Sequence, residues 1–331
     1  LQGDATEEAA VDTIREALKT VSVCFLDLLK YKRDGTPFWN RLSITPLKNS
    51  AGEVTHYVGV QSDITELKET KQRLELANKN LETFHQRITE ELSQASRAQQ
   101  FMLPARLPDN DKIRFSARFE PMDQIGGDFY DIIELDQDIY GILIADVTGH
   151  GIPAALLTYM TSFAFKSSAQ SITSTERVVT STNKKLIDKM PQGAFVTMFY
   201  AIYNTSTRIL TYTRAGHPPG IIVRPATKEV ILLSTTGSLV GVFRRDKITY
   251  GESAMILQPG DKVLLYTDAI MEVRDGSNHM LEEDELTSFL VSKCDEPITR
   301  LVDMVYQFGI DYSGKPAYDD DFTMIGFEVM S

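Results

Sequence analysis

Apolar and polar residues alternate near the start of the chain with the two-residue period that is typical of half-buried strands. Residues 21–29 and 38–47 carry this alternation, and the turn sequence KRDGTP at residues 32–37 joins them. A third alternating run covers residues 55–61, and a helical pattern over residues 11–18 precedes all three. The pattern predicts one helix followed by strands.

The pattern then changes to a seven-residue repeat. No glycine or proline occurs between Ile64 and Pro104. Apolar residues recur at every seventh position, with further apolar residues between them: Leu67, Leu74, Leu81, Ile88, Ala95 and Met102, with Ala77, Phe84 and Ala98 at the companion positions. This repeat predicts a helix of about 35 residues that forms a parallel coiled-coil dimer. A long amphipathic helix packed on its own chain is the alternative.

Strands and helices are mixed throughout the remaining sequence. Predicted strands cover residues 114–119, 140–147, 196–203, 209–215, 220–223, 262–267 and 322–329, and predicted helices cover 153–168, 176–190, 284–291 and 298–306. Grouped strands and grouped helices favour layered sheets flanked by helices over a regular alternation. The fold class expected is therefore α/β of the α+β kind. The predicted domains are a sensor-like unit at 1–65, a linker helix at 66–104 and a third domain at 105–331.

Composition excludes several classes of partner. The net charge is -12, which argues against general binding to nucleic acid or to an anionic membrane surface. No apolar run approaches the ~18 residues that a membrane span needs. Two cysteines, Cys24 and Cys294, give neither a disulfide framework nor a zinc pattern. A cytoplasmic setting fits best, and the chain starts abruptly at LQG, as if cut from a longer protein.

Candidate chemistry is concentrated in acidic motifs at or near the ends of apolar, strand-like runs. The motifs are GGDFYD at 126–131, DVTGHG at 146–151, YTDAIME at 266–272 and DDDFT at 319–323. A buried carboxylate is costly unless it is solvated, hydrogen-bonded or bound to a cation. Any one of these acids alone is most simply a cap or turn residue. Together they favour an all-oxygen site for Mg²⁺ or Mn²⁺. Two such ions suit hydrolysis of a phosphate ester by an activated water.

The second motif also contains a histidine and two glycines. No serine or cysteine lies in a recognisable nucleophile motif, so a catalytic triad through His150 has little support. Gly149 and Gly151 let the backbone turn before the next helix, and a helix end that faces phosphate remains an alternative. The sequence therefore favours Asp146 over His150 as the functional residue of this motif.

Residues 98–329 resemble the metal-dependent, type 2C protein serine/threonine phosphatases, in their bacterial RsbU/SpoIIE-like branch. The motifs occur in the family's order, and two more belong to the set: AQQFMLP at 98–104 and AGHPP at 215–219. The resemblance implies a β-sandwich flanked by helices, with two metal ions in a cleft at one end. It also implies a phosphorylated protein substrate, such as an anti-sigma-factor antagonist of a stress-response switch.

The resemblance assigns the site residue by residue. Asp128 and Asp146 match the catalytic acids that approach both ions, and Val147 would add its backbone carbonyl. Asp268 and Asp320 would complete the metal ligands. Two further residues would lie behind the ligands: Asp321 and His150. No clear match exists for the arginine that binds substrate phosphate in eukaryotic relatives, and Arg118 is only a weak candidate.

The front of the chain resembles the second half of a LOV-type PAS domain, a flavin-based light sensor. The matching segments are YKRDGTPFWN at 31–40 and HYVGVQSDIT at 56–65. Gln2, Asn40 and Gln61 match positions that hydrogen-bond the flavin, whereas Lys30 replaces the family's usual asparagine. The first half of the domain, with its reactive cysteine, is missing. FMN is therefore expected only in a longer chain that carries the whole domain.

Taken together, the sequence predicts a sensor-regulated phosphatase that removes phosphate from serine or threonine of a partner protein and dimerises through the coiled coil. Two alternatives stay open. One is a catalytically weak dimeric signalling scaffold, and the other is a two-metal nucleotide hydrolase.

Overall fold

The computed structural model describes residues 6–170, 173–244 and 249–330. The chain divides into two compact units, residues 1–89 and 90–331, and the division falls within one continuous helix, α2 (Thr65–Gln100). Each unit is described here by itself. The division into three domains made from the sequence stays a prediction.

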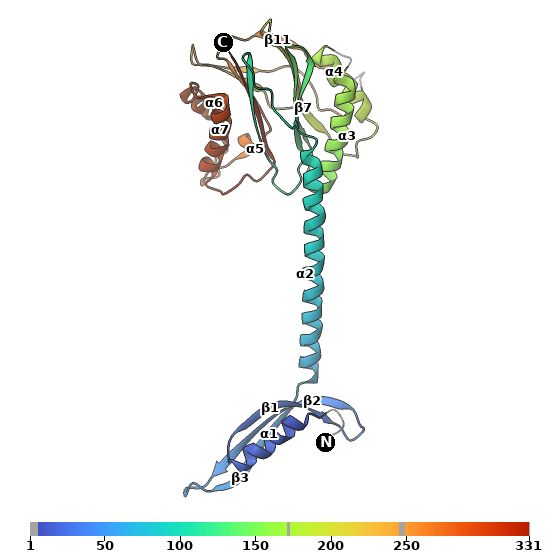
Figure 1. The fold of residues 1–331 in the computed structure, drawn as a ribbon, viewed down its shortest axis with the longest axis vertical. Coiled ribbons are helices and arrows are strands. Elements are labelled where there is room, and N and C mark those ends of the chain that lie inside the picture. The colour runs from blue at the N-terminus through green and yellow to red at the C-terminus, as the bar shows by residue number, and fades with distance from the viewer. Residues whose placement is uncertain (1–5, 171–172, 245–248, 331) are drawn as a thin grey trace. The chain divides into compact units, whose positions relative to one another are not determined.

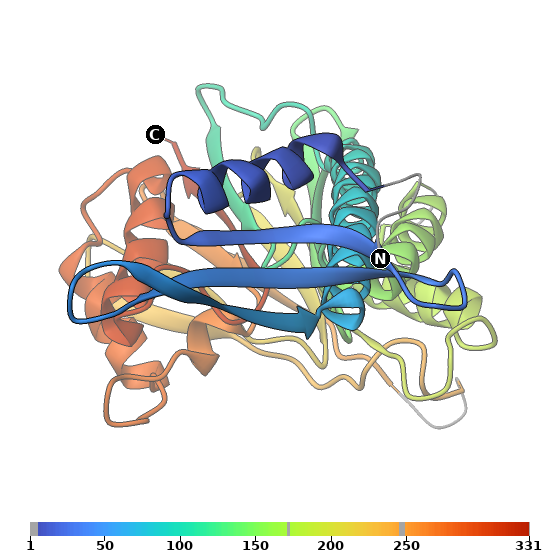
Figure 2. The same ribbon diagram turned by 90° about the horizontal axis from the view of Figure 1, so that it is seen from below.

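The first unit is a small antiparallel sheet with one helix against it. Its elements are α1 (Glu8–Lys19), β1 (Cys24–Tyr31), β2 (Pro37–Lys48) and β3 (Val54–Asp63). The strands lie in the order β1-β2-β3, and α1 runs beside them (Figure 2). Ala10 of α1 packs on Leu28 and Leu42. The predicted helix and three strands are confirmed.

The long helix α2 is also confirmed, and its heptad seam is open. Leu67, Leu74 and Leu81 are 58%, 60% and 65% exposed, respectively. In the described chain the seam is therefore not buried against the rest of the protein. The pairing of α2 with a second copy stays a prediction.

The second unit is a sandwich of two antiparallel five-stranded sheets. One sheet has the order β10-β9-β12-β13-β4 and the other β11-β8-β7-β6-β5. The strands are β4 (Ile113–Glu120), β5 (Asp128–Asp136), β6 (Ile139–Val147), β7 (Val196–Asn204), β8 (Ile209–Ala215), β9 (Gly220–Arg224), β10 (Glu229–Leu233), β11 (Ser253–Ile256), β12 (Lys262–Tyr266) and β13 (Phe322–Val329).

Helices cover the outer faces of this sandwich (Figure 1). They are α3 (Gly151–Ala169), α4 (Thr175–Leu186), α5 (Ala269–Glu272), α6 (Glu283–Ser292) and α7 (Ile298–Ser313). The pair α3 and α4 packs on the sheet that contains β7, and α6 and α7 pack on the sheet that contains β12. Between the sheets lies a core of large side chains, among them Ile142, Phe199 and Phe327. The predicted layered α+β fold is confirmed.

Three strands and one short helix were not predicted from the sequence. β5 begins inside the acidic motif GGDFYD, and acids at both sides of Phe129 and Tyr130 interrupt the apolar pattern expected of a buried strand. β10 and β11 contain only five and four residues, and α5 is a single turn. The predicted helix at 176–190 is correct in place but ends earlier, at Leu186. Among the described residues, no helix combines the length and apolar character needed to cross a bilayer.

Candidate active site

Antiparallel pairing brings the four acidic motifs to one edge of the sandwich. β5 and β6 are neighbours in one sheet, and their register places Asp128 directly opposite Asp146. In the other sheet β12 pairs with β13, so Asp268, just after β12, lies near Asp320, just before β13. The sequence placed all these acids at or near the ends of strand-like runs, which includes both termini of a strand and therefore covers Asp128 and Asp320. They lie where strands begin, because the start of one antiparallel strand adjoins the end of its neighbour.

Hydrogen bonds across the sandwich join the segments that carry the two acidic pairs. The Thr267 hydroxyl donates to Asp128 Oδ2 at 2.8 Å, although the two residues belong to different sheets. Asp321 accepts from the Met122 N–H at 2.7 Å and from the Gly127 N–H at 2.6 Å. Asp321 is therefore occupied by backbone donors of the loop before β5, as a residue behind the ligands would be.

The carboxylate of Asp128 on β5 is buried and that of Asp146 on β6 is half-buried. Asp128 is 1% exposed, and burial followed by the neighbouring charge of Asp146 raises its pKa well above the ordinary value. Burial, together with the charges of Asp268 and Asp320, raises the pKa of Asp146 to about 7. Ion pairs found in the described part of the chain include neither residue. Such an edge attracts positive charge.

Asp268 belongs to the same electrostatic cluster. Burial raises its pKa above the ordinary value, and the charge of Asp320 adds to the effect. Glu272, one turn further along α5, also has a raised pKa through burial and the charges of Asp268 and Asp320. The charges of both sheets therefore act on one another across this edge.

Close approach of the backbone explains the glycine pair before Asp128. A Cβ atom added at Gly127 would lie 2.4 Å from the Val147 carbonyl oxygen. A Cβ atom at Gly126 would lie 2.4 Å from Asp321 Oδ2. Both distances are far below a van der Waals contact, so only glycine fits at these positions. The loop is thereby held against the carbonyl that the sequence assigned to a metal.

The donor set matches a hard divalent cation in its chemistry. It consists of carboxylates and one backbone carbonyl, which are oxygen ligands of the kind that Mg²⁺ and Mn²⁺ take. Within the described ranges, however, no three His, Cys, Asp or Glu side chains are gathered closely enough to form a metal site as they stand. The acids stand as two pairs, one from each sheet, so binding of a cation would require them to draw together.

The two histidines of the motifs occupy different surroundings. His150 directly precedes α3, is exposed, and has Nδ1 3.5 Å from Asp123 Oδ2. His217 of the AGHPP motif is 1% exposed and its Nδ1 lies 2.8 Å from the Thr197 hydroxyl. Burial lowers the pKa of His217 to about 3, so the ring is neutral and has a packing role.

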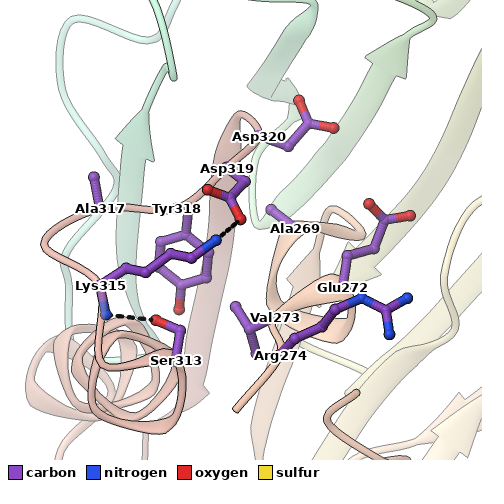
Figure 3. A pocket seen from close by; sticks show the side chains of 10 residues that line it. All are labelled: Ala269, Glu272, Val273, Arg274, Ser313, Lys315, Ala317, Tyr318, Asp319 and Asp320. Carbon is purple, nitrogen blue, oxygen red and sulfur yellow. Dashed lines mark hydrogen bonds and ion pairs between the residues drawn. The ribbon is translucent and has the colours of Figure 1, made fainter. Parts of the chain in front are cut away.

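A pocket of about 210 Å³ opens beside Asp320 (Figure 3). Its wall carries two basic side chains, Arg274 and Lys315, and Lys315 is paired with Asp319. Glu272 lines the same pocket. Both basic and acidic side chains therefore line the pocket next to Asp320.

The residues assigned to flavin lie on the small N-terminal sheet, apart from Gln2, which is outside the described residues. Asn40 is 2% exposed, and the strand register places it and Gln61 on the same face. Gln61 accepts a hydrogen bond of 2.9 Å from Lys30, the residue that departs from the LOV pattern. Flavin binding stays an expectation for a longer chain.

Sequence reasoning did not identify two polar residues that hold the site. Thr267 precedes Asp268 in the third motif, and its hydroxyl bonds Asp128. Gln99 lies in the AQQFMLP segment, and its side chain bonds the backbone of Gly126. The position of each inside a family motif was the available signal, but the partner of each depends on the three-dimensional fold.

Solved structures of PP2C phosphatase domains have the same fold as this sandwich of two antiparallel sheets. The SiaA-PP2C domain of Pseudomonas aeruginosa superposes with a TM-score of 0.65 at 21% identity, covering 74% of this chain and 98% of that one. A structure of the RsbU and RsbW domains of Rv1364c from Mycobacterium tuberculosis gives a TM-score of 0.58 at 21% identity, covering 67% of this chain and 61% of that one.

The sequence profile of Stage II sporulation protein E (SpoIIE) matches residues 136–330, more than half of the chain. The chain belongs to the SpoIIE family. A PAS domain profile matches residues 1–66. Both resemblances drawn from the motifs are thereby confirmed.

Curated relatives match each part of the chain. Phosphoserine phosphatase RsbU of Bacillus subtilis is 28% identical over 248 residues, which is 75% of this chain and 72% of that protein. A blue-light-activated histidine kinase of Brucella anthropi is 45% identical over 65 residues, or 20% of this chain and 13% of that protein. The chain covers only a small part of this second relative.

Proposed function

We propose that this chain is a metal-dependent protein serine/threonine phosphatase regulated by its PAS-type unit. The observation that carries the proposal is the acidic edge, where buried Asp128 lies opposite half-buried Asp146 and no ion pair found among the described residues compensates either carboxylate. A protein keeps such an arrangement where an external cation is to bind. Membership of the SpoIIE family and the relation to a phosphoserine phosphatase support the same conclusion.

Each residue of the edge has a defined task in this reaction. Asp128 and Asp146 would hold two divalent cations together, with the Val147 carbonyl, while Asp268 and Asp320 complete the ligands from the other sheet. When bound, two Mn²⁺ or Mg²⁺ ions supply an activated water and neutralise charge on the phosphoryl group. Thr267 donates to Asp128 and fixes the direction of its carboxylate. Asp321 holds the loop through the N–H groups of Met122 and Gly127.

The substrate that we propose is phosphoserine or phosphothreonine on a partner protein. RsbU is named a phosphoserine phosphatase, and an anti-sigma-factor antagonist is the partner that the family resemblance implies. The proposed assembly is a homodimer through α2. Its apolar seam, exposed at Leu67, Leu74 and Leu81, supports a second copy as the partner of this helix.

The test measures phosphate release from a phosphoserine protein and from a nucleoside triphosphate, each with and without Mn²⁺. We expect release from the phosphoprotein, dependence on the metal, and loss of both in Asp268→Asn. Release from the nucleotide alone would assign a nucleotide hydrolase. Calorimetry with Mn²⁺ tests the remaining alternative, a catalytically weak signalling scaffold. Such a scaffold would neither bind the ion at this edge nor release phosphate.

A further inference from the structure

One buried side chain connects the last turn of α2 to the loop that carries Asp128. Gln99 is 3% exposed. Its Nε2 donates to the Gly126 carbonyl at 2.7 Å, and its Oε1 accepts from the Gly126 N–H at 3.1 Å. The amide thus satisfies both backbone groups of one residue, in the way that a neighbouring strand would.

Further contacts restrain the backbone of Gly126 and of the next residue, Gly127. A Cβ atom at Gly126 would meet the Asp321 carboxylate, and the next N–H, of Gly127, donates to that carboxylate at 2.6 Å. The Gly127 carbonyl accepts from the Thr158 hydroxyl at 3.0 Å and from the Val147 N–H at 3.2 Å. The loop is therefore fixed from three sides: Gln99 on one, Asp321 on another, and Thr158 with Val147 on the third.

Gln99 contacts this loop from α2 through two hydrogen bonds. Its neighbour Gln100 is exposed, as is Arg97 two residues earlier. An amide so deeply buried is kept only if its hydrogen bonds are made, because an unmet polar group would cost stability. Both of its bonds go to the residue two positions before Asp128, so a shift of this turn of the helix displaces the start of β5.

We propose that Gln99 is a positioning residue of the active site, which makes the last turn of α2 part of the apparatus that places Asp128. It touches neither substrate nor metal. It sets the Gly126–Gly127 backbone, and through it the separation of Asp128 from Asp146 and the Val147 carbonyl. This inference rests on the proposed function for its effect on metal binding, but the fixed loop itself can be measured without any metal.

The first measurement is amide hydrogen exchange of residues 121–129 in the metal-free full chain. In Gln99→Leu the Gly126 N–H loses its acceptor, and we expect exchange at Gly126 and Gly127 to accelerate about tenfold. Gln99→Glu keeps the length and one acceptor, so it should fall between Gln99→Leu and the wild type at these amides. Gln100→Leu is the matched control and should leave the segment unchanged.

The second measurement is the Mn²⁺ concentration that gives half-maximal phosphatase activity. We expect a rise of about tenfold in Gln99→Leu with an unchanged KM for the phosphoprotein, partial recovery in Gln99→Glu, and no change in Gln100→Leu. If Gln99→Leu fails to fold, Gln99→Glu carries both measurements.

The two measurements separate the possible failures. Unchanged exchange at Gly126 and Gly127 in a folded Gln99 variant would overturn the role of Gln99. Faster exchange with no change in the Mn²⁺ requirement would also overturn it, since the loop would then be loosened without effect on the site. A wild-type chain that releases no phosphate refutes the proposed function, and the exchange result still decides whether Gln99 fixes the loop.

Discussion

The two ends of β12 carry aspartates in opposite electrostatic surroundings: Asp261 is buried beside an arginine, whereas Asp268 is half-buried among other acids. Asp261, just before the strand, is 1% exposed and bonds Arg224, with Nη2 2.9 Å from Oδ2. The Gln258 N–H donates to the same carboxylate at 2.8 Å. At the far end, Asp268 lies beside Asp320 and within the field of Asp146, and no ion pair in the described residues includes it. One strand therefore joins a compensated acid to an uncompensated one.

The contrast distinguishes a structural acid from a functional one. At Asp261 the chain provides the cation itself, so the ion pair is complete when the protein folds. At the other end the acids repel one another, and folding leaves that repulsion in place. The free energy that would relieve it must come from outside the chain, which is the thermodynamic basis of a binding site.

The largest effect, on phosphatase turnover, is expected from replacing one acid of the edge that has no ion-pair partner. Asp146→Asn should lower phosphatase turnover by about a thousandfold or more, since the acid that holds both ions is lost. The metal-free protein should be no less stable, because a repelling charge has gone. Turnover with a phosphoserine substrate and thermal unfolding measure the two. Asp136→Asn, at the exposed far end of β5, is the control. Turnover of Asp146→Asn within tenfold of the wild type would refute the assignment.

At the ion pair of Asp261 with Arg224, a substitution should lower stability and leave turnover nearly unchanged. Arg224→Ala leaves Asp261 buried and unpaired, which should reduce the free energy of unfolding by about 3 kcal/mol with little change in turnover. Urea unfolding measures the loss. Arg300, whose side chain is 68% exposed and pairs with Glu296, provides the control, and Arg300→Ala should cost less than about 0.5 kcal/mol. Equal losses in the two variants would remove the distinction between the ends.

Added metal should stabilise the protein through the acidic edge at Asp146 and Asp268, and not through Asp261. At about 100 times its dissociation constant, Mn²⁺ should raise the free energy of unfolding by about 2.7 kcal/mol. The increase should persist in Arg224→Ala and vanish in Asp146→Asn. Thermal unfolding across a Mn²⁺ titration measures it, with Ca²⁺ at the same ionic strength as a comparison. An increase that survives in Asp146→Asn would place the ion elsewhere.

The smallest effect is expected at Arg118, the weak candidate for binding substrate phosphate. Its guanidinium pairs with Asp303 at 3.0 Å and Glu120 at 2.9 Å and lies 3.7 Å from the centre of the Tyr306 ring. An arginine so engaged is part of the packing, so Arg118→Ala should change KM for the phosphoprotein less than about threefold and stability by about 1 kcal/mol. A tenfold rise in KM would show instead that it reaches the substrate.

The sequence predicted those parts of the molecule that depend on local pattern. The heptad repeat predicted α2, and the acidic motifs indicated the acids that lie along one edge of the sandwich, whose role as metal ligands stays a prediction. It did not predict β5, because acidic residues recur along DFYDIIELD and interrupt both the apolar run and the alternation by which strands are recognised. The bonds of Gln99 to Gly126 and of Thr267 to Asp128 span 27 and 139 residues along the chain. Such contacts follow from strand order and sheet packing, which no local pattern encodes.

Two of the acids come from each sheet of the sandwich, so the distances between the pairs depend on how the two sheets pack. Asp128 and Asp146 belong to one sheet, whereas Asp268 and Asp320 flank strands of the other. Metal ions held by acids of both sheets would link the two layers, so their affinity would depend on how the sheets are aligned. Core side chains far from the edge, such as Phe327 packed on Tyr203, would then tune metal affinity by setting that alignment.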